Sequence, residues 1–268
     1  MSNLVARAAQ NLNLVRQKKP LIHNITNLVV MNITANALLA MGASPVMAHA
    51  KNEVREMVAL AGALVLNIGT LSDEWVASMV RAGEKASELN IPVILDPVGS
   101  GATTFRTASA QKLIEKINIR VIRGNPSEVL SLGHQDSKTK GVDSLHTVDD
   151  AAITAKVLSQ QLKTKLAVTG PTDLVTDGVR IIRILNGHPL MSCITGSGCM
   201  ATAIIAAFLA VDEDAVSASA TALSYFGLAG EIAGNDSDGP GTFMVRLLDA
   251  LYNIMPETLE KGARIIES

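Results

Sequence analysis

The 268-residue sequence has few aromatic side chains and almost no net charge, and both features exclude classes of protein. Aromatic residues make up only 3% of the chain, so its core must be built mainly from aliphatic side chains and methionine. The formal net charge is −2, and no run of Lys or Arg is longer than Lys18-Lys19. Because such a chain lacks the basic patch that nucleic acids and anionic membranes attract, we expect no nucleic-acid and no membrane partner.

Cysteine is equally scarce, since the chain contains only Cys193 and Cys199. Two cysteines are too few for a disulfide framework, and their spacing, without a nearby histidine pair, is a poor zinc signature. The first residues lack a basic segment followed by an apolar run, so we expect a cytoplasmic location. The most apolar segment, residues 200–211, is shorter than the roughly 20 residues that cross a bilayer and is predicted to be a buried helix.

The two common nucleotide-binding signatures are also absent. The sequence contains no G-x-x-x-x-G-K-[ST] loop, and no G-x-G-x-x-G follows the first predicted strand. A nucleotide enzyme with this sequence must therefore use another architecture.

Short apolar runs alternate with helical segments through most of the chain. Strands are predicted at residues 20–27, 44–48, 63–70, 91–95, 119–122 and 165–168. Helices are predicted at residues 4–19, 29–41, 53–60, 72–90, 107–117, 126–132, 147–162, 200–211 and 215–233, with a last one after Pro240-Gly241. Buried strands separated by helices predict an α/β fold with a mainly parallel central sheet and helices on both faces.

Two other features complete the predicted organisation. Asp177-Gly178 between apolar runs predicts one antiparallel hairpin, and residues 133–146 are read as an exposed loop. No low-complexity linker divides the chain, so we expect a single domain over residues 1–268.

Polar residues follow several predicted strands, at the end where open parallel sheets bind ligands. These ends are Gly69-Thr70, Asp96-Pro97, Arg123-Gly124-Asn125 and Thr169-Gly170. An acid can hold Mg²⁺, and a cation with glycine backbone N–H groups can neutralise phosphates, so the set indicates phosphoryl transfer. Two alternatives stay open: Asp96 is also a turn former before proline, and Glu128 completes a capping box that begins at Asn125.

The stretch Thr195-Gly196-Ser197-Gly198-Cys199 directly precedes the most apolar helix. Its glycines allow a ligand to approach the backbone, and the first N–H groups of the helix form an anion site. A plain turn into a core helix is the alternative. Asn24 and Asn27 stand before the helix of residues 29–41 and are either ligand-binding or capping side chains, with Asn27 the candidate N-cap.

Taken in order, these motifs resemble the hydroxyethylthiazole kinase family of the ribokinase-like superfamily. The resemblance runs through nearly the whole chain and is carried by residues 20–27, 32–36, 42–47, 95–99, 123–128 and 195–199. It implies a ribokinase-like three-layer sandwich and an ATP-dependent kinase of 4-methyl-5-(2-hydroxyethyl)thiazole, phosphorylated at its primary hydroxyl in thiamine salvage. It also implies Mg²⁺ and a homotrimer with sites near the subunit boundaries.

The resemblance also implies roles for single residues at the matching motifs. For the thiazole it implies contacts from Met47 and Gly196, to which we add Asn24 as a candidate. For ATP it implies contacts from Arg123 and Thr169, with Gly198 expected at the phosphates. For the Mg²⁺ shell it implies Asp96 and Glu128.

Cys199 stands where the wider superfamily usually has an aspartate general base, although the thiazole kinase branch also has cysteine there. A thiol with an ordinary pKa of about 8.5 is a poor base at neutral pH, and phosphoryl transfer depends mostly on positioning and charge neutralisation. We expect Cys199 to be a weak base or to orient the substrate hydroxyl, with packing as the alternative. Cys193 is expected to pack in the interior.

Three other readings compete with the thiazole kinase. One is a cysteine nucleophile paired with one of the five histidines, which thiol-dependent turnover without ATP would favour. Another is a nucleotide-binding protein without turnover. A third keeps the kinase but changes the substrate to a related heterocyclic alcohol, because a small apolar pocket discriminates a methylene by only about 1 to 3 kcal/mol.

Overall fold

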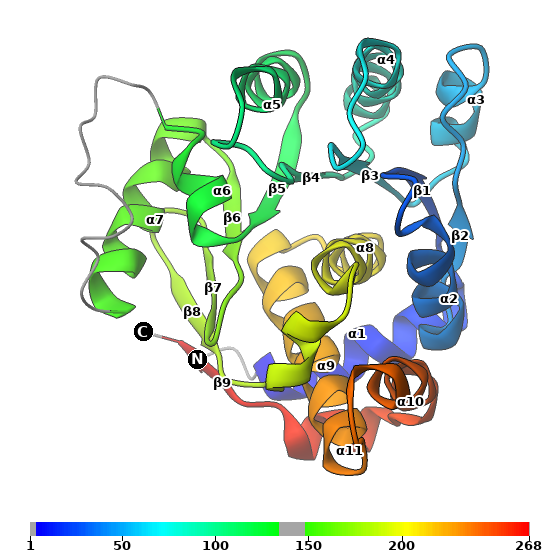
Figure 1. Ribbon diagram of the computed structural model, residues 1–268, viewed down its shortest axis with the longest axis vertical. Helices are drawn as coiled ribbons and strands as arrows, with labels where there is room; N and C mark the ends of the chain where they lie inside the picture. Colours follow the sequence, from blue (N-terminus) through cyan, green and yellow to red (C-terminus); the bar gives the residue numbers. More distant parts are fainter. Residues whose placement is uncertain (1–3, 134–147, 268) are drawn as a thin grey trace.

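Nine strands form one sheet in the computed structural model, which describes residues 4–133 and 148–267 (Figure 1). The strand order is β2-β1-β3-β4-β5-β6-β7-β8-β9. All pairings from β2 to β6 are parallel, and those from β6 to β9 are antiparallel. The strands are β1 (Leu21–Ile25), β2 (Ser44–Val46), β3 (Ala63–Asn67), β4 (Val93–Asp96), β5 (Ile119–Gly124), β6 (Lys165–Val168), β7 (Asp173–Thr176), β8 (Ile181–Ile184) and β9 (Ile265–Glu267).

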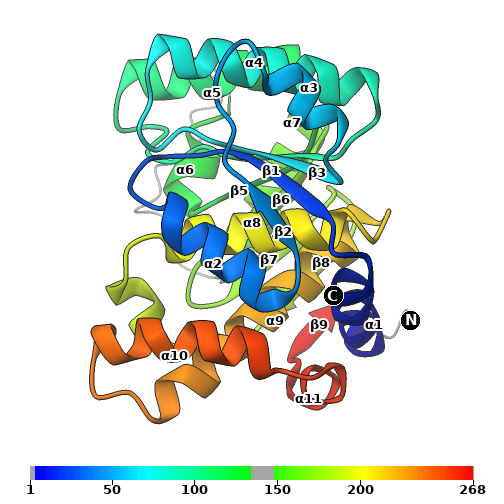
Figure 2. The ribbon, with the colours of Figure 1, turned by 90° about the vertical axis from the view of Figure 1, so that its right-hand side faces the viewer.

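Helices cover both faces of this sheet and make a three-layer arrangement (Figure 2). On one face lie α3, α4, α5 and α7, and on the other α8 and α9 lie against the strands with α1, α2, α10 and α11 around them. The helices are α1 (Leu4–Lys18), α2 (Met31–Met41), α3 (Val54–Ala59), α4 (Asp73–Glu88), α5 (Thr104–Lys116), α6 (Pro126–Leu130), α7 (Val148–Leu162), α8 (Ser197–Leu209), α9 (Ala215–Asn235), α10 (Pro240–Asn253) and α11 (Pro256–Gly262), with the 3₁₀ helix η2 (Pro189–Cys193) before α8.

Helix α8 is central to the fold, and its composition explains why. Every residue from Met200 to Leu209 is buried, because the sheet lies on one side of the helix and α2 and α9 lie on the other. Helix α9 is rich in Ala, Ser and Gly, which lets its backbone approach its neighbours closely. At Gly227 a Cβ atom would lie 2.6 Å from the carbonyl oxygen of Asn186, so a larger residue could not be accommodated there. Helix α8 is thereby packed between the sheet and α9, with its first turn at Ser197.

The predicted α/β fold with a mainly parallel sheet is confirmed. The hairpin at Asp177-Gly178 is also confirmed, because it joins β7 and β8 and Gly178 adopts the left-handed φ of 87°. The sequence predicted only this one antiparallel pair of strands. In the described structure β6 also pairs with β7, and β8 with β9, in antiparallel orientation. Strand β9, helix α11 and η2 were not predicted, and of the expected loop at 133–146 residues 134–146 lie outside the described residues.

Within the described ranges, no helix has both the length and the apolarity that a bilayer crossing requires.

Candidate active site

The parallel strands bring polar side chains to one edge of the sheet, in the order of the strands. Asn27 follows β1, Asn67 ends β3, Asp96 ends β4, Arg123 lies near the end of β5, and Thr169 follows β6. Asn67 and Asp96 are partners in the register of β3 and β4. Because all these strands run in the same direction, their carboxyl ends share one edge, as predicted from the sequence.

The glycine turn, residues 195–199, lies at this edge and leads into α8. Gly196 is the N-cap residue with a left-handed φ of 85°, and its carbonyl accepts the first helical hydrogen bond, from Met200 N–H at 2.8 Å. A Cβ atom on Gly196 would lie 2.9 Å from Val30 Cγ1, so glycine is needed for both the backbone conformation and the close contact. The N–H groups of the first turn have no partner within the helix and form an anion site.

Asp96 lies at the centre of the site and is fully buried. Its Oδ2 atom accepts hydrogen bonds from Asn67 Nδ2 at 2.9 Å and Thr202 Oγ1 at 2.8 Å, and it lies 3.7 Å from Arg123 Nη1. Its Oδ1 atom has no partner. Burial raises the pKa of this carboxyl to about 6, although Arg123 and the hydrogen bond from Thr202 oppose the shift. A buried, unpartnered carboxylate oxygen is suited to bind a cation.

Cys199 lies next to Asp96 in the first turn of α8. Its sulfur accepts hydrogen bonds from Asn67 Nδ2 at 3.2 Å and from Asn27 Nδ2 at 3.4 Å. Burial, together with the negative charge of Asp96, raises the pKa of the thiol to about 11, even though the two amides and Arg123 oppose the shift. The thiol therefore carries its proton at neutral pH.

Arg123 connects Asp96 to the glycine turn. Its Nη2 donates to Thr169 Oγ1, and its Nε is buried without a partner. A Cβ atom on Gly198 would lie only 2.4 Å from Arg123 Nη1, so the guanidinium lies directly against the start of α8. A fixed cation and the helix N-terminus thus meet at one point, which is an arrangement that binds phosphate.

Glu128 completes the capping box that the sequence predicted. Its Oε2 atom accepts from Asn125 N–H at 2.9 Å, while the side chain of Asn125 accepts from Glu128 N–H at 2.9 Å. Its Oε1 atom accepts from Gly99 N–H at 2.9 Å. Each carboxylate oxygen still has a free lone pair, so capping does not prevent a role near a metal ion.

The residues present fit a magnesium ion that is held partly by nucleotide. In the described ranges no group of three or more His, Cys, Asp or Glu side chains is placed to hold a metal ion. Mg²⁺ usually takes one or two carboxylates and completes its shell with phosphates and water. Asp96, with its unpartnered Oδ1, and Glu128, whose charge is felt by Asp96, form such a pair.

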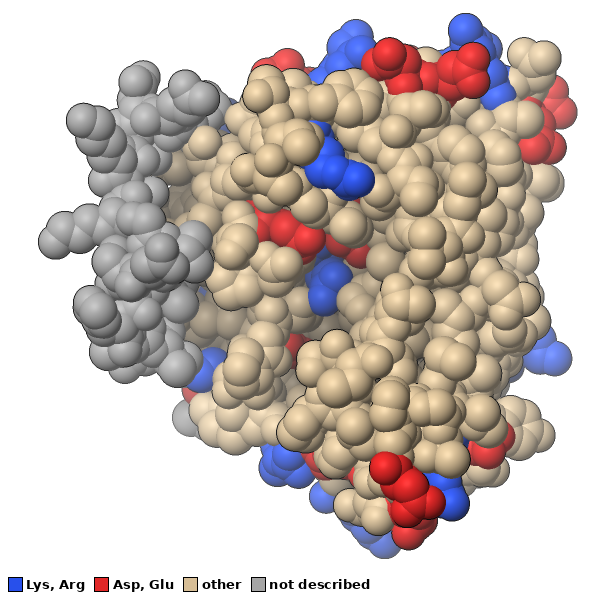
Figure 3. All heavy atoms as spheres, in the orientation of Figure 1, with Lys and Arg blue, Asp and Glu red and all other residues tan. Residues whose placement is uncertain are grey.

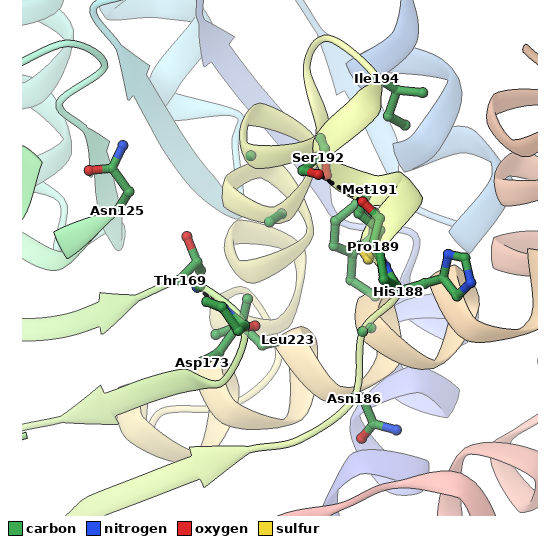
Figure 4. A pocket seen from close by; sticks show the side chains of 18 of the residues that line it. Asn125, Thr169, Asp173, Asn186, His188, Pro189, Met191, Ser192, Ile194 and Leu223 are labelled. Carbon is green, nitrogen blue, oxygen red and sulfur yellow. Dashed lines mark hydrogen bonds between the residues drawn. The ribbon is translucent and has the colours of Figure 1, made fainter. Parts of the chain in front are cut away.

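A cavity of about 700 Å³ opens beside this cluster (Figure 4). The volume lies in the range of small-molecule sites. Figure 3 shows the hollow in the centre of the face, with charged side chains of both signs at its walls. Its polar part is lined by Arg123, Asn125, Thr169, Asp173 and the glycine turn, and its apolar part by Met191, Ile194, Leu223 and Phe226.

The structure brings most of the predicted site residues together. Arg123, Thr169, Gly196 and Gly198 line the cavity. Asp96 and Cys199 join them through the contacts of Arg123 and Asn67.

Two predicted substrate contacts lie outside the cavity, toward the β2 end of the sheet. Asn24 is buried on β1, where its Nδ2 donates to Ile22 O at 2.8 Å and its Oδ1 has no partner. Met47 follows β2 and is half-buried.

Two local predictions were wrong. Asn27 does not cap α2, because the N-cap residue is Val30 and no side chain caps the helix there. The amide of Asn27 instead donates to Asn67 Oδ1 at 3.0 Å and to the Cys199 sulfur at 3.4 Å, so both of its N–H groups are used in tertiary contacts. Cys193 is exposed rather than packed, because η2 has no buried residue.

Three further polar residues of the site were missed from the sequence. Asn67 was read as part of an apolar run that stops in Gly69-Thr70, and Thr202 as part of an apolar helix. Asp173 begins β7 at the cavity wall, where its Oδ1 accepts from Gly170 N–H at 2.9 Å and burial raises its pKa to about 6. A polar residue inside an otherwise apolar run was the signal available for Asn67 and Thr202.

The contact between Gly198 and Arg123 gives a first prediction. In Gly198→Ala the new methyl group displaces the guanidinium, so we expect the KM for ATP to rise about tenfold. Thermal stability should fall slightly, because the displaced guanidinium no longer faces Asp96 and this loss outweighs the better helix propensity of alanine. Steady-state kinetics and thermal unfolding check both expectations.

The matched control is Gly241→Ala, which changes the second residue of α10 as Gly198 is the second residue of α8. No atom lies within 4 Å of the Cβ position at Gly241, so we expect no kinetic effect. Equal KM values for ATP in the two variants would contradict the placement of Arg123 at the nucleotide.

Comparison with known proteins places this geometry in a known group. A sequence profile of the hydroxyethylthiazole kinase family matches residues 12–257. A protein of Desulfotalea psychrophila (strain LSv54 / DSM 12343) named hydroxyethylthiazole kinase is 63% identical over 268 residues, which is 100% of this chain and 98% of that protein. The solved structure of a hydroxyethylthiazole kinase from Pyrococcus horikoshii OT3 is 43% identical, with a TM-score of 0.91 over 98% of this chain and 99% of that one.

A more distant structure shares the fold alone. It is a ribokinase-like superfamily protein from Enterococcus faecalis V583, which is 13% identical with a TM-score of 0.69 over 96% of this chain and 95% of that one.

Proposed function

The chain belongs to the hydroxyethylthiazole kinase family, and from this membership we infer that it transfers a phosphoryl group from ATP to the primary hydroxyl of 4-methyl-5-(2-hydroxyethyl)thiazole. The products are the thiazole phosphate and ADP, in thiamine salvage. The observation that carries the residue assignments is the cluster of Asp96, Arg123 and Cys199 at the N-terminus of α8. An acid, a cation and a helix N-terminus at one point suit phosphoryl transfer.

We propose that ATP occupies the cavity, with its phosphates against Arg123, Thr169 and the backbone of Gly198. Three observations support this placement. Arg123 has a buried Nε without a partner, Thr169 accepts a hydrogen bond from its guanidinium, and Gly198 in the first turn of α8 lies against that guanidinium. Charge-assisted hydrogen bonds of this kind are the strong ones in phosphate sites.

We propose that the thiazole alcohol binds on the other side of the reacting centre, toward Met47, Asn24 and Gly196. The strand order supports this division of the edge. Met47 follows β2 and Asn24 lies on β1, whereas Arg123 and Thr169 belong to β5 and β6. The hydroxyl and the terminal phosphate then meet between them, near β3 and β4, which suits an in-line transfer.

We propose that Asp96 and Glu128 hold Mg²⁺, directly or through water. When bound, the ion would neutralise charge on the phosphates. The unpartnered Oδ1 of Asp96 supports the assignment, because a buried carboxylate oxygen without a partner is costly unless a ligand satisfies it.

We propose that Cys199 orients the substrate hydroxyl and is at most a weak base. Burial raises the pKa of its thiol to about 11, so only a minute fraction is ionised at neutral pH. A protonated thiol can still hydrogen-bond the alcohol, and the positioning of the reactants supplies most of the catalysis in this chemistry.

This role predicts that Cys199→Asp keeps or raises turnover. The carboxylate would accept the same two hydrogen bonds, from Asn27 and Asn67, and it would be a stronger base at neutral pH than a protonated thiol. The kcat of the variant at saturating ATP and alcohol checks the expectation.

A dead Cys199→Asp enzyme would instead mark an essential thiol nucleophile. The structure already disfavours that reading, because the partners of the Cys199 sulfur in the described part of the chain are two asparagine amides rather than a histidine. The exposed Cys193 provides the control, since Cys193→Asp should leave kcat unchanged.

We also propose a homotrimer, a single domain and a cytoplasmic location. Figure 3 shows a largely uncharged area beside the hollow. Exposed apolar side chains lie on the loop before α2 and on or just after α10. They are Leu28, Val29, Val245, Tyr252 and Met255. Helices α2 and α10 contact each other, and exposed apolar side chains on neighbouring elements support an interface between subunits. Sedimentation should give three times the 28.1 kDa mass of the chain, and a monomer would contradict the proposal.

The catalytic function is tested by mass spectrometry of the alcohol after incubation with the protein, ATP and Mg²⁺. We expect the thiazole phosphate, and we expect none when ATP is omitted. ATP binding without product would indicate a different alcohol or a nucleotide-binding protein without turnover. Trials with other heterocyclic alcohols would separate those two.

A further inference from the structure

Asn67 has no role in the assignments above, although it occupies the centre of the site. It is the last residue of β3 and only 1% exposed. In the register of the sheet it is the partner of Asp96 on β4, so the two side chains emerge side by side on the same face. That face is the one covered by α8, which carries Cys199.

The amide of Asn67 uses its full hydrogen-bonding capacity. Its Nδ2 donates to Asp96 Oδ2 at 2.9 Å and to Cys199 Sγ at 3.2 Å. Its Oδ1 accepts from Gly69 N–H at 3.0 Å and from Asn27 Nδ2 at 3.0 Å. Two donors and two acceptors are all that an asparagine side chain offers. Because the backbone N–H of Gly69 requires an acceptor, the oxygen must face it, and the amino group must face Asp96 and Cys199.

A second asparagine reinforces this arrangement. Asn27 donates from Nδ2 to Asn67 Oδ1 and also to Cys199 Sγ, the latter at 3.4 Å. The Cys199 sulfur therefore lies between two amide donors from neighbouring strand ends. With its lone pairs directed at these donors, its own S–H is available to another partner.

We propose that Asn67 is a positioning residue for phosphoryl transfer, which holds the Cys199 sulfur and the Asp96 carboxylate in one fixed arrangement. The inference rests on the roles proposed above for those two residues. Without the shared amide, no single amide joins the sulfur to the carboxylate, and only Asn27 still donates to the sulfur, at the longer distance of 3.4 Å. A displacement of about 1 Å at a reacting centre can cost about 10²-fold in rate.

The test begins with Asn67→Asp, which keeps acceptors for Gly69 and Asn27, replaces the amino donor to Cys199 and Asp96 by an oxygen, and places a second carboxyl group beside Asp96. We expect kcat to fall by about tenfold to a hundredfold, with the KM for ATP changed by less than about twofold. A loss confined to kcat distinguishes positioning from a general loosening of the site, which would also weaken ATP binding.

The matched control is Asn11→Asp. Asn11 is also fully buried and donates from Nδ2 to a carboxylate, that of Asp212, and to a hydroxyl, that of Thr221. It lies on α1, which contributes no residue to the cavity lining. We expect a similar loss of thermal stability and an unchanged kcat. An equal fall of kcat in both variants would overturn the inference.

A double-mutant cycle with Cys199→Ala decides whether Asn67 acts through the thiol. We expect the effect of Asn67→Asp on kcat to shrink at least threefold in the Cys199→Ala background, as coupled neighbours do. The full loss in that background would overturn the inference. If Cys199→Ala alone leaves kcat unchanged, the proposed role of Cys199 is wrong, and so is this inference. The kinase activity is tested separately, by product formation with the unaltered chain.

Discussion

Asp96→Asn should lower kcat about 10³-fold while the chain stays folded. The carboxylate is fully buried at the centre of the site, and its Oδ1 has no protein partner. Loss of its charge would weaken the proposed Mg²⁺ site, and the ion would supply several kcal/mol of stabilisation to the charged transition state, where each 1.36 kcal/mol is tenfold in rate. Single-turnover kinetics at saturating ATP measure the effect.

The same substitution should not lower thermal stability at pH 8. The folded pKa of about 6 lies above the ordinary value of 3.8, so the folded chain binds this proton more readily than the unfolded chain. The ionised carboxylate therefore costs stability above pH 6, by about 3 kcal/mol, and the cost fades as pH falls through 6 toward 4. Asp96→Asn removes that cost. A variant that fails to fold would show that Asp96 serves structure rather than chemistry.

Arg123→Ala should raise the KM for ATP roughly 10²-fold. The substitution removes the cation beside the first turn of α8, and truncating one partner of a buried charged contact costs about 2 to 5 kcal/mol. It also leaves Asp96 without a nearby positive charge, so we expect lower thermal stability at pH 8. Nucleotide titration and thermal unfolding check the two parts.

Two variants control for Arg123→Ala. Arg120 lies on the same strand, but its side chain is exposed and donates to Glu213 O at 2.7 Å. Arg120→Ala should therefore leave the KM for ATP unchanged. Arg123→Lys keeps the charge without the two-pronged geometry and should fall between the wild type and the alanine variant. Unchanged ATP affinity in Arg123→Ala would contradict its assignment.

The parts of the site that lie at strand ends could be predicted from the sequence. Asp96 and Arg123 each follow an apolar run that forms a buried strand, and parallel strands must bring such ends to one edge. The glycines before α8 could be predicted for a similar reason, because a helix start next to that edge needs a backbone that a ligand can approach.

The parts that depend on register could not be predicted. Asn67 and Asp96 become neighbours only because β3 and β4 pair at that position, and the amide reaches Cys199 only because α8 lies on the same face. Asn27 resembled an N-cap because sequence shows the helix that follows it and not the sulfur that lies across from it. Strand β9 was missed because it is short and partly exposed, and because its partner β8 lies far away in the sequence.

The most direct test of this account is a crystal structure of the chain with a non-hydrolysable ATP analogue, Mg²⁺ and the thiazole alcohol. The account predicts that the terminal phosphate lies at the first turn of α8, between Arg123 and Asp96. It also predicts that the alcohol oxygen approaches from the Met47 side, within hydrogen-bonding distance of Cys199. A terminal phosphate bound among Met191 and Leu223, or an alcohol bound on the Thr169 side, would contradict it.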